Sequence, residues 1–251
     1  MLEYLAVRFA PHEPMYFVAG FAEPTSKFQF SLKYQVIGDE GSLARAAPWV
    51  TGFHLAYSQT SFWDLAGGES NPFFDSSYRP EVLYLYEQPD AKWLPGLARF
   101  DVQTGLRHES NGQEGPDSRS LNMVYVQPVF TFGDPGTGAA RGGFFVAVAP
   151  RVWGYVFNLD DNPDIAEYRG YGDLRVVAGW RGGWQLSALG RMGNDWDKGG
   201  LELSLSYPLR NITRGNLDLY LYGQFWTGYG ESLLEYEEST TTFRLGVAIV
   251  R

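Results

Sequence analysis

Apolar and polar residues alternate with a period of two along most of the chain. In residues 28–36, FQFSLKYQV, the apolar and aromatic side chains would face one side, and Gln, Ser and Lys the other. Residues 174–180, 201–207 and 243–249 alternate in the same way. Successive side chains of a strand point to opposite faces, so the pattern predicts half-buried β-strands. Convincing helical periodicity is nearly absent, which indicates an all-β protein.

Twelve alternating segments follow one another along the 251 residues. They span residues 14–22, 27–37, 49–62, 79–87, 97–110, 119–132, 143–157, 171–180, 184–192, 200–207, 216–227 and 241–250. Short Gly-rich turns tend to alternate with longer polar loops, at 64–78, 111–118, 158–170, 193–199 and 228–240. No change of composition marks a linker, so residues 1–251 are expected to form one domain.

Two architectures fit this pattern: a soluble β-sandwich or barrel, and an outer-membrane barrel with an apolar outside and a polar lumen. The polar faces carry Lys33, Arg175, Glu202 and Arg244, which are costly in a dry core but normal in a membrane-barrel lumen. Aromatic residues near the strand ends would form an interfacial girdle: Trp49, Trp63, Trp153, Trp180, Trp184, Tyr207 and Trp226. We therefore predict a twelve-stranded antiparallel transmembrane β-barrel, with the soluble β-protein as the alternative.

Composition narrows the function classes. The chain has no Cys, which excludes disulfides, zinc–thiolate sites and a cysteine nucleophile. A net charge of −9 argues against nucleic acid as a partner. Its 30 Gly and 16% aromatic residues suit many strands joined by tight turns. No apolar run approaches the roughly 18 residues of a membrane helix, and the first residues, MLEYLAVRFAPHEP, do not read as a signal peptide.

A candidate catalytic cluster lies on two neighbouring segments. His108 and Ser110 are two residues apart, so both leave the same, apolar side of a strand. A hairpin through residues 111–118 could bring Asn122 beside His108. Ser needs an adjacent base to become a nucleophile, and the base needs a group that orients it. Polar groups on a lipid-facing surface are unfavourable in free energy, so a cluster of them there calls for a functional reason. Acyl transfer on a lipid substrate would be such a reason; the alternative is that Ser110 merely opens a turn.

Several stretches together resemble one protein family. They are residues 108–112 (HESNG) with 116–122 (PDSRSLN), 57–63 (YSQTSFW), 160–165 (DDNPDI) and 227–233 (TGYGESL). These stretches are similar to those of the outer-membrane phospholipase A of Gram-negative bacteria, and the resemblance runs from about residue 25 to the end of the chain. It implies a bacterial outer-membrane barrel that hydrolyses acyl esters of phospholipids and lysophospholipids with calcium, and is active as a homodimer.

The resemblance also implies roles for single residues. Ser110 would be the nucleophile, His108 the general base and Asn122 the residue that orients it. The backbone N–H of Gly112 would bind the oxyanion. Further residues would hold calcium or face the dimer partner: the Ser118 hydroxyl, the Gln113 carbonyl and Ser70 of the partner subunit as calcium ligands, and Gln59 at the dimer interface.

Some positions depart from the family pattern. Gln113 stands where Arg is expected; a backbone carbonyl ligand survives this change, but a positive charge is lost. Gly115 stands where Asp is expected, which puts a second calcium site in this loop in doubt. The alignment around Ser70 is shifted by one residue and depends on Pro72, so Asn71 is an alternative ligand.

Two further questions stay open at the level of sequence. The acidic loop with Asp160, Asp161 and Asp164 could bind calcium or could be a solvated loop with a turn at Asn162. A non-enzymatic barrel, either a pore or an adhesion scaffold, is the alternative function. Such a barrel would be indifferent to Ser110→Ala.

Overall fold

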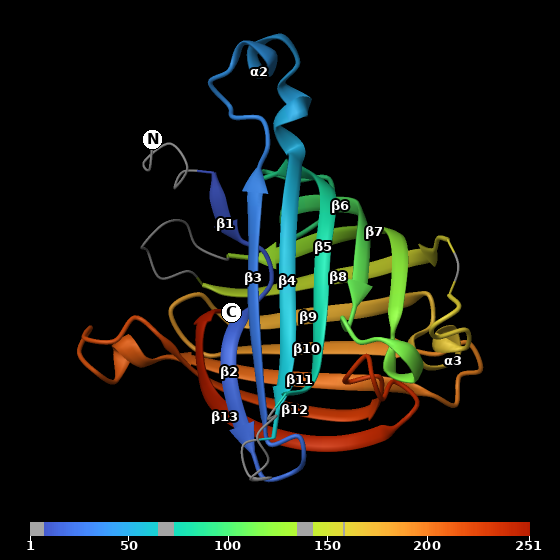
Figure 1. Ribbon diagram of the computed structural model, residues 1–251. Helices are drawn as coiled ribbons and strands as arrows, with labels where there is room; N and C mark the ends of the chain where they lie inside the picture. Colours follow the sequence, from blue (N-terminus) through green and yellow to red (C-terminus); the bar gives the residue numbers. More distant parts are fainter. Residues whose placement is uncertain (1–7, 65–72, 135–142, 158) are drawn as a thin grey trace.

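The computed structural model describes residues 8–64, 73–134, 143–157 and 159–251 (Figure 1). Its strands are β1 Phe9–Pro11, β2 Met15–Gly20, β3 Ser26–Gln35, β4 Phe53–Trp63, β5 Phe73–Gln88, β6 Leu97–Ser110, β7 Ser120–Gly133, β8 Phe144–Tyr155, β9 Gly172–Trp180, β10 Gln185–Met192, β11 Gly199–Pro208, β12 Tyr220–Tyr229 and β13 Ser239–Val250. The helical turns are α2 Ser42–Ala46, η1 Pro48–Gly52, η2 Gly115–Asp117, α3 Ile165–Arg169 and η3 Leu209–Asn211.

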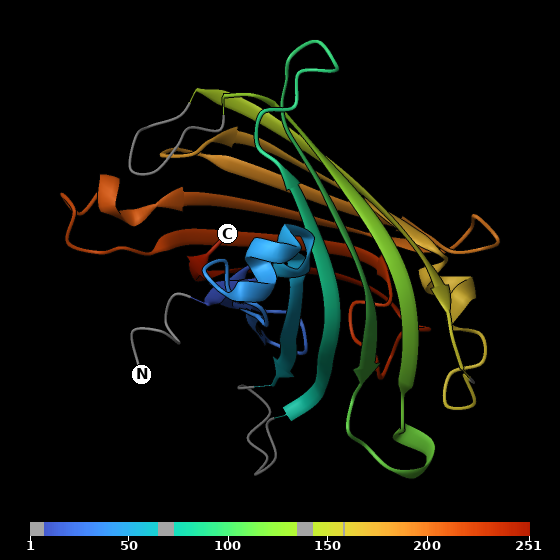
Figure 2. The same cartoon turned by 90° about the horizontal axis from the view of Figure 1, so that it is seen from above.

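The strands close into an antiparallel barrel. Each strand from β2 to β13 pairs with its neighbours in the chain, and β2 also pairs with β13, which closes the ring (Figure 2). The three-residue β1 adds to β3 beyond the end of β2. The predicted twelve-stranded antiparallel barrel is therefore confirmed. Within the described ranges, no helix is long and apolar enough to cross a bilayer.

Several boundaries differ from the predicted segments, among them those at β5, at β4 and at the turn after β3. Strand β5 begins at Phe73 and not at residue 79, because polar side chains such as Asp75 and Ser77 face the lumen and are buried there. Residues 48–52 form η1, so β4 begins at Phe53. The short turn expected after β3 is widened by α2 and η1, which project from the end of the barrel opposite the loop after β6 (Figure 1).

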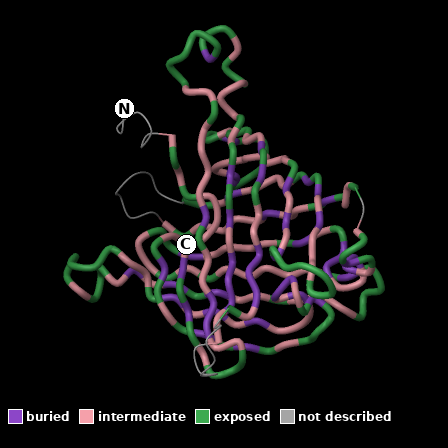
Figure 3. Tube along the Cα trace, viewed as in Figure 1, coloured by how far each residue is buried: buried purple, intermediate pink, exposed green. Residues whose placement is uncertain are grey.

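Burial alternates along several strands of the wall (Figure 3), and most regularly along β13. On β13, Phe243, Leu245 and Ile249 are more than half exposed on the outside, while the intervening Arg244 is 1% exposed. Arg175 and Glu202 likewise line an internal cavity. Charged groups can face inward because opposite charges pair there: Arg244 Nη1 lies 2.6 Å from Glu231 Oε1.

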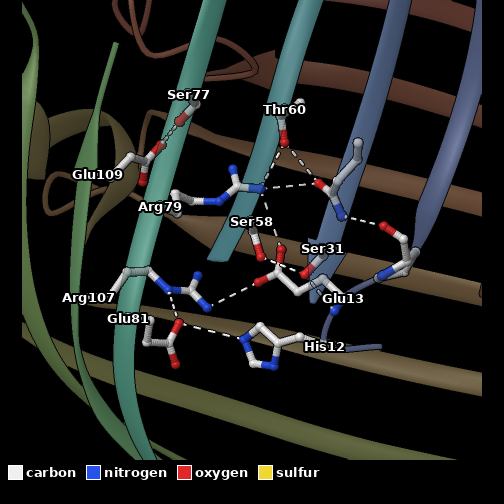
Figure 4. A network of polar contacts seen from close by, with 12 residues as sticks. His12, Glu13, Ser31, Ser58, Thr60, Ser77, Arg79, Glu81, Arg107 and Glu109 are labelled. Carbon is white, nitrogen blue, oxygen red and sulfur yellow. Dashed lines mark hydrogen bonds and ion pairs between the residues drawn. The ribbon is translucent and has the colours of Figure 1, made fainter. Parts of the chain in front are cut away.

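The segment between β1 and β2 enters the lumen and is held there by charge (Figure 4). Glu13 Oε1 lies 3.0 Å from Arg107 Nη2, and Glu13 Oε2 lies 3.4 Å from Arg79 Nη2. The backbone N–H of Glu13 donates to Ser31 Oγ at 2.9 Å, and His12 Nε2 lies 3.6 Å from a Glu81 oxygen. Cavities of about 150 and 280 Å³ border this segment. Paired charges thus occupy much of the lumen.

An apolar cluster occupies the lumen at the end of the barrel where the loop after β6 lies. It contains Leu121, Met123, Tyr125, Trp153, Ile165, Leu233 and Tyr236. Trp153 and Trp226 are 9% and 3% exposed, so their assignment to an outer aromatic girdle was wrong. Residues such as Ile165 and Leu233, from segments that fold into this end of the lumen, form an apolar environment in which Trp153 can face inward. Trp180 and Trp184, each about half exposed, do face outward as the girdle requires.

Candidate active site

Strands β6 and β7 place three of the expected site residues on one patch of the outer wall. His108 is the direct partner of Asn122 in the antiparallel register, and Ser110 is the partner of Ser120. Their neighbours on the same face, Leu106 and Val124, are 44% and 49% exposed. The patch therefore faces the hydrocarbon side of the wall and not the lumen.

The polar contact within this patch defines the tautomer of the histidine. His108 Nδ1 lies 3.0 Å from Asn122 Oδ1. An amide oxygen only accepts, so Nδ1 carries the proton and Nε2 is left as the basic nitrogen. Ser110 follows two positions along the same face of β6. The structure thus brings His108 and Asn122 into contact and aligns Ser110 with them.

The loop after Ser110 is organised by a buried amide. Asn111 is 3% exposed, and its Nδ2 donates to Asp117 O at 2.7 Å. Its Oδ1 accepts from the backbone N–H groups of Arg119 and Gln113, at 3.0 and 3.2 Å. Gly112 has a φ of +71°, a conformation that favours glycine. Asn111 belongs to the HESNG stretch of the family resemblance, and its Asn-Gly dipeptide is the sequence signal for this turn.

A second loop holds the far end of this segment. Asp161 Oδ2 accepts hydrogen bonds from Ser118 Oγ at 3.1 Å and Ser120 Oγ at 2.8 Å. Asn162 is fully buried, and its Oδ1 accepts from the backbone N–H of Ser120 at 2.9 Å. Asp161 itself is exposed at the surface. The acidic loop therefore has a structural contact with the candidate site, whichever of its two predicted roles holds.

The oxygen atoms at this point are of the kind that calcium prefers. The Ser118 hydroxyl lies beside the Asp161 carboxylate, and Gln113 is exposed in the same loop. Hydroxyl, carbonyl and carboxylate oxygens are the usual calcium ligands. In the described part of the chain, no three His, Asp or Glu side chains gather as a metal cluster. Ser70 and its alternative Asn71 lie outside the described residues.

Gln59 belongs to a row of hydrogen-bonded polar groups on the wall. Tyr57 Oη donates to Gln59 Oε1 at 2.9 Å, and Gln59 Nε2 donates to Ser61 Oγ at 3.1 Å. Ser61 Oγ lies 2.8 Å from Ser76 Oγ on β5. The neighbouring Leu55 and Tyr57, which share the face of β4 with Gln59, are exposed, so this row lies on the outer side of the wall.

The loop of residues 230–238 covers the lumen at this end. The backbone N–H groups of Leu233 and Leu234 donate to Asp75 Oδ2 at 2.9 and 3.0 Å. Tyr236 donates its hydroxyl hydrogen to Asp164 Oδ1. Burial, together with this carboxylate, raises the pKa of Tyr236 above its ordinary value. The hydrogen bond of Tyr236 joins the loop of residues 230–238 to the loop that carries Asp164.

The chain is similar to known proteins over nearly its whole length. Residues 9–249 match the phospholipase A1 family. Phospholipase A1 of Escherichia coli is 35% identical over 229 residues, which cover 89% of this chain and 68% of that protein. Phospholipase A1 of Klebsiella pneumoniae is 35% identical over 234 residues, covering 89% and 69%.

Solved structures agree with this relationship. Outer membrane phospholipase A from Escherichia coli has a TM-score of 0.74 and 27% identity, covering 99% of this chain and 96% of that chain. The calcium-bound dimer of outer membrane phospholipase from Salmonella typhi has a TM-score of 0.76 and 27% identity, covering 97% and 92%. The chain therefore belongs to the phospholipase A1 family and is an outer-membrane phospholipase.

Proposed function

We propose that this phospholipase cleaves acyl esters of phospholipids and lysophospholipids through Ser110, His108 and Asn122, with calcium, as a homodimer. The single observation that carries the proposal is the 3.0 Å contact between His108 Nδ1 and Asn122 Oδ1 on the outward face. On the outward face of the wall, this polar pair faces the lipid and not the lumen. An Asn-to-Ala active-site mutant of the Escherichia coli enzyme has a solved structure, which supports an Asn in this role.

The chemistry proceeds in two halves. His108 Nε2 takes the hydroxyl proton of Ser110 as Oγ attacks the ester carbonyl carbon, and the backbone N–H of Gly112 donates to the developing oxyanion. The imidazolium then protonates the departing lysophospholipid oxygen as the ester C–O bond breaks. Water attacks the acyl–Ser110 ester, gives its proton to His108, and fatty acid leaves as Ser110 recovers its hydrogen.

Calcium would be held by the Ser118 hydroxyl, the Gln113 carbonyl and Ser70 of the partner subunit. When bound, it supplies positive charge beside the oxyanion. Support comes from the hard oxygen donors around Ser118 and from the calcium bound to the Salmonella typhi dimer. Asp161, hydrogen-bonded to Ser118, adds a negative charge that favours a cation at this point.

Dimerisation is proposed to use Gln59. Hydrogen bonds between membrane-embedded segments contribute about 0.6–2 kcal/mol each. Gln59→Leu is therefore expected to weaken the dimer by about 1 kcal/mol, or roughly fivefold in Kd, measured by sedimentation equilibrium in detergent with calcium. Leu201→Met on another part of the wall is the control. An unchanged Kd for Gln59→Leu would remove Gln59 from the interface.

The proposed roles are tested by fatty-acid release from phospholipid in mixed micelles. Asn122→Ala is expected to lower kcat by about 10- to 100-fold, because the imidazole loses its orienting acceptor. Asn122→Asp, which keeps an acceptor oxygen, should retain more activity. Equal kcat for wild type and Asn122→Ala would contradict the role of Asn122. The pore alternative is disfavoured by the paired charges around Glu13 and Arg107 in the lumen.

A further inference from the structure

Glu109 occupies an unusual place in the site, because it lies between His108 and Ser110 but on the opposite face of β6. Strand alternation sends its side chain into the lumen, where the residue is 5% exposed. Its Oε1 accepts from Ser77 Oγ of β5 at 2.6 Å (Figure 4) and from Arg169 Nη1 at 3.1 Å. The backbone that carries both proposed catalytic side chains is thus fixed from behind.

Arg169 connects this strand to both loops at the barrel mouth. It is the last residue of α3, and its side chain is 9% exposed. Besides Glu109, its guanidinium donates to Ser232 O at 3.2 Å and to Gly230 O at 3.4 Å. The loop that leads into α3 carries Asp161, the acceptor for Ser118 and Ser120. One buried ion pair therefore joins the catalytic strand to the loop beside the proposed calcium ligand.

The packing around the pair makes this connection stiff. Leu121, the register partner of Glu109, is fully buried and packs in the same cluster as Ile165 of α3. A buried carboxylate keeps its charge here because the charges of Arg169 and Arg79 and the Ser77 hydroxyl compensate for its lost hydration. Removing either member of the Glu109–Arg169 pair leaves the other without its direct charge partner in the lumen, which favours a movement of the strand or of α3 that hydrates it.

We propose that the Glu109–Arg169 pair is a positioning device for the reaction, which holds His108 and Ser110 in line with the segment that carries Ser118. The proposal rests on the proposed function, since it concerns the placement of those residues. Neither member of the pair contacts substrate; both act through β6 and the loops. Displacements of about 1 Å far from the reacting atoms can cost roughly 100-fold in rate.

The test compares Glu109→Gln, Arg169→Met and Glu109→Asp with wild type, in kcat, KM and the calcium concentration for half-maximal rate. We expect Glu109→Gln and Arg169→Met to lower kcat by about 10- to 100-fold at saturating calcium, to raise the calcium requirement, and to leave KM within about twofold. Glu109→Asp, which keeps the carboxylate, should recover most of kcat. If the charge variants do not fold, Ser77→Ala replaces them in the test, because it removes only one hydrogen bond to Glu109. It should lower kcat by a smaller factor.

Asp173→Asn is the matched control, because the Arg151–Asp173 pair is also a lumen ion pair but joins β8 to β9. It should lower the melting temperature without changing kcat. Wild-type kcat in Glu109→Gln and Arg169→Met, or an equal loss in Asp173→Asn, would overturn the proposal.

Hydrogen exchange of the amides of residues 108–111 and 118–122 separates this inference from the proposed function. Glu109→Gln should speed exchange in both segments, whereas Asp173→Asn should not. If the wild-type protein released no fatty acid, the proposed function would be refuted, but the effect of the Glu109–Arg169 pair on the two segments would not. Unchanged exchange in Glu109→Gln would refute the positioning role, whatever the activity.

Discussion

Ser110→Ala is expected to lower fatty-acid release by about 10³- to 10⁶-fold, because it removes the only nucleophile of the proposed mechanism. The rate that remains would come from direct attack of water on the bound ester, helped by substrate binding and by the contacts to the oxyanion. The fold should not change, since Ser110 is a partly exposed residue at the end of β6. The measurement is single-turnover release of labelled fatty acid from phospholipid in mixed micelles.

Ser187→Ala provides the control for this substitution. Ser187 lies on β10 and accepts from Arg175 Nη1 at 3.1 Å inside the lumen, far along the wall from β6. Its replacement should leave the release of fatty acid within twofold of wild type. If Ser110→Ala retained wild-type release, another nucleophile would have to be sought, and the outward placement of Ser110 would have no catalytic meaning.

Calcium removal is expected to lower the rate by at least about 10²-fold. The loss of one oxyanion-stabilising group typically costs about 10²- to 10³-fold in kcat, and here a full positive charge would be lost. The measurement adds a chelator to the active enzyme and then restores calcium. Ser118→Ala should shift the calcium concentration for half-maximal rate upward, because a hydroxyl ligand is removed.

Magnesium is the informative control for the calcium experiment. It demands near-ideal octahedral geometry at short distances and gives up its waters reluctantly. The proposed ligands, which are a hydroxyl and a carbonyl of an exposed loop and a group of the partner subunit, would suit calcium better, so magnesium should restore little of the rate. Full activity in chelator would contradict the calcium proposal while leaving Ser110, His108 and Asn122 intact as the reacting group.

Much of the fold was predictable because a barrel wall imposes one rule on every strand. Residues such as Phe243 and Arg244 alternate between lipid and lumen, and period-two patterning records that directly. The same rule aligned His108, Ser110 and Asn122, since strand register follows from the hairpin. Family resemblance added roles that alternation alone could not assign.

The parts that were missed depend on contacts between segments far apart in the chain. Trp153 follows the lumen-facing Arg151 by two positions on β8 and so points inward; what no local pattern encodes is the apolar cluster around it, which includes residues of loops that fold into the mouth. The first residues of β5 resemble a loop because Asp75 and Ser77 are polar, yet Asp75 Oδ2 and Ser77 Oγ have hydrogen-bond partners inside the barrel. The contact of Asp161 with Ser118 spans 43 positions and joins the loop before β7 to the loop after β8.

The outward direction of the His108–Asn122 pair has a consequence for how substrate arrives. A phospholipid lies in the same membrane as the barrel and would reach the proposed catalytic pair by lateral diffusion within the leaflet. The search is two-dimensional, and the relevant concentration is a surface density, not an amount per volume. An inhibitor of this enzyme must therefore partition into the membrane before it competes, and its potency will scale with the amount of lipid present.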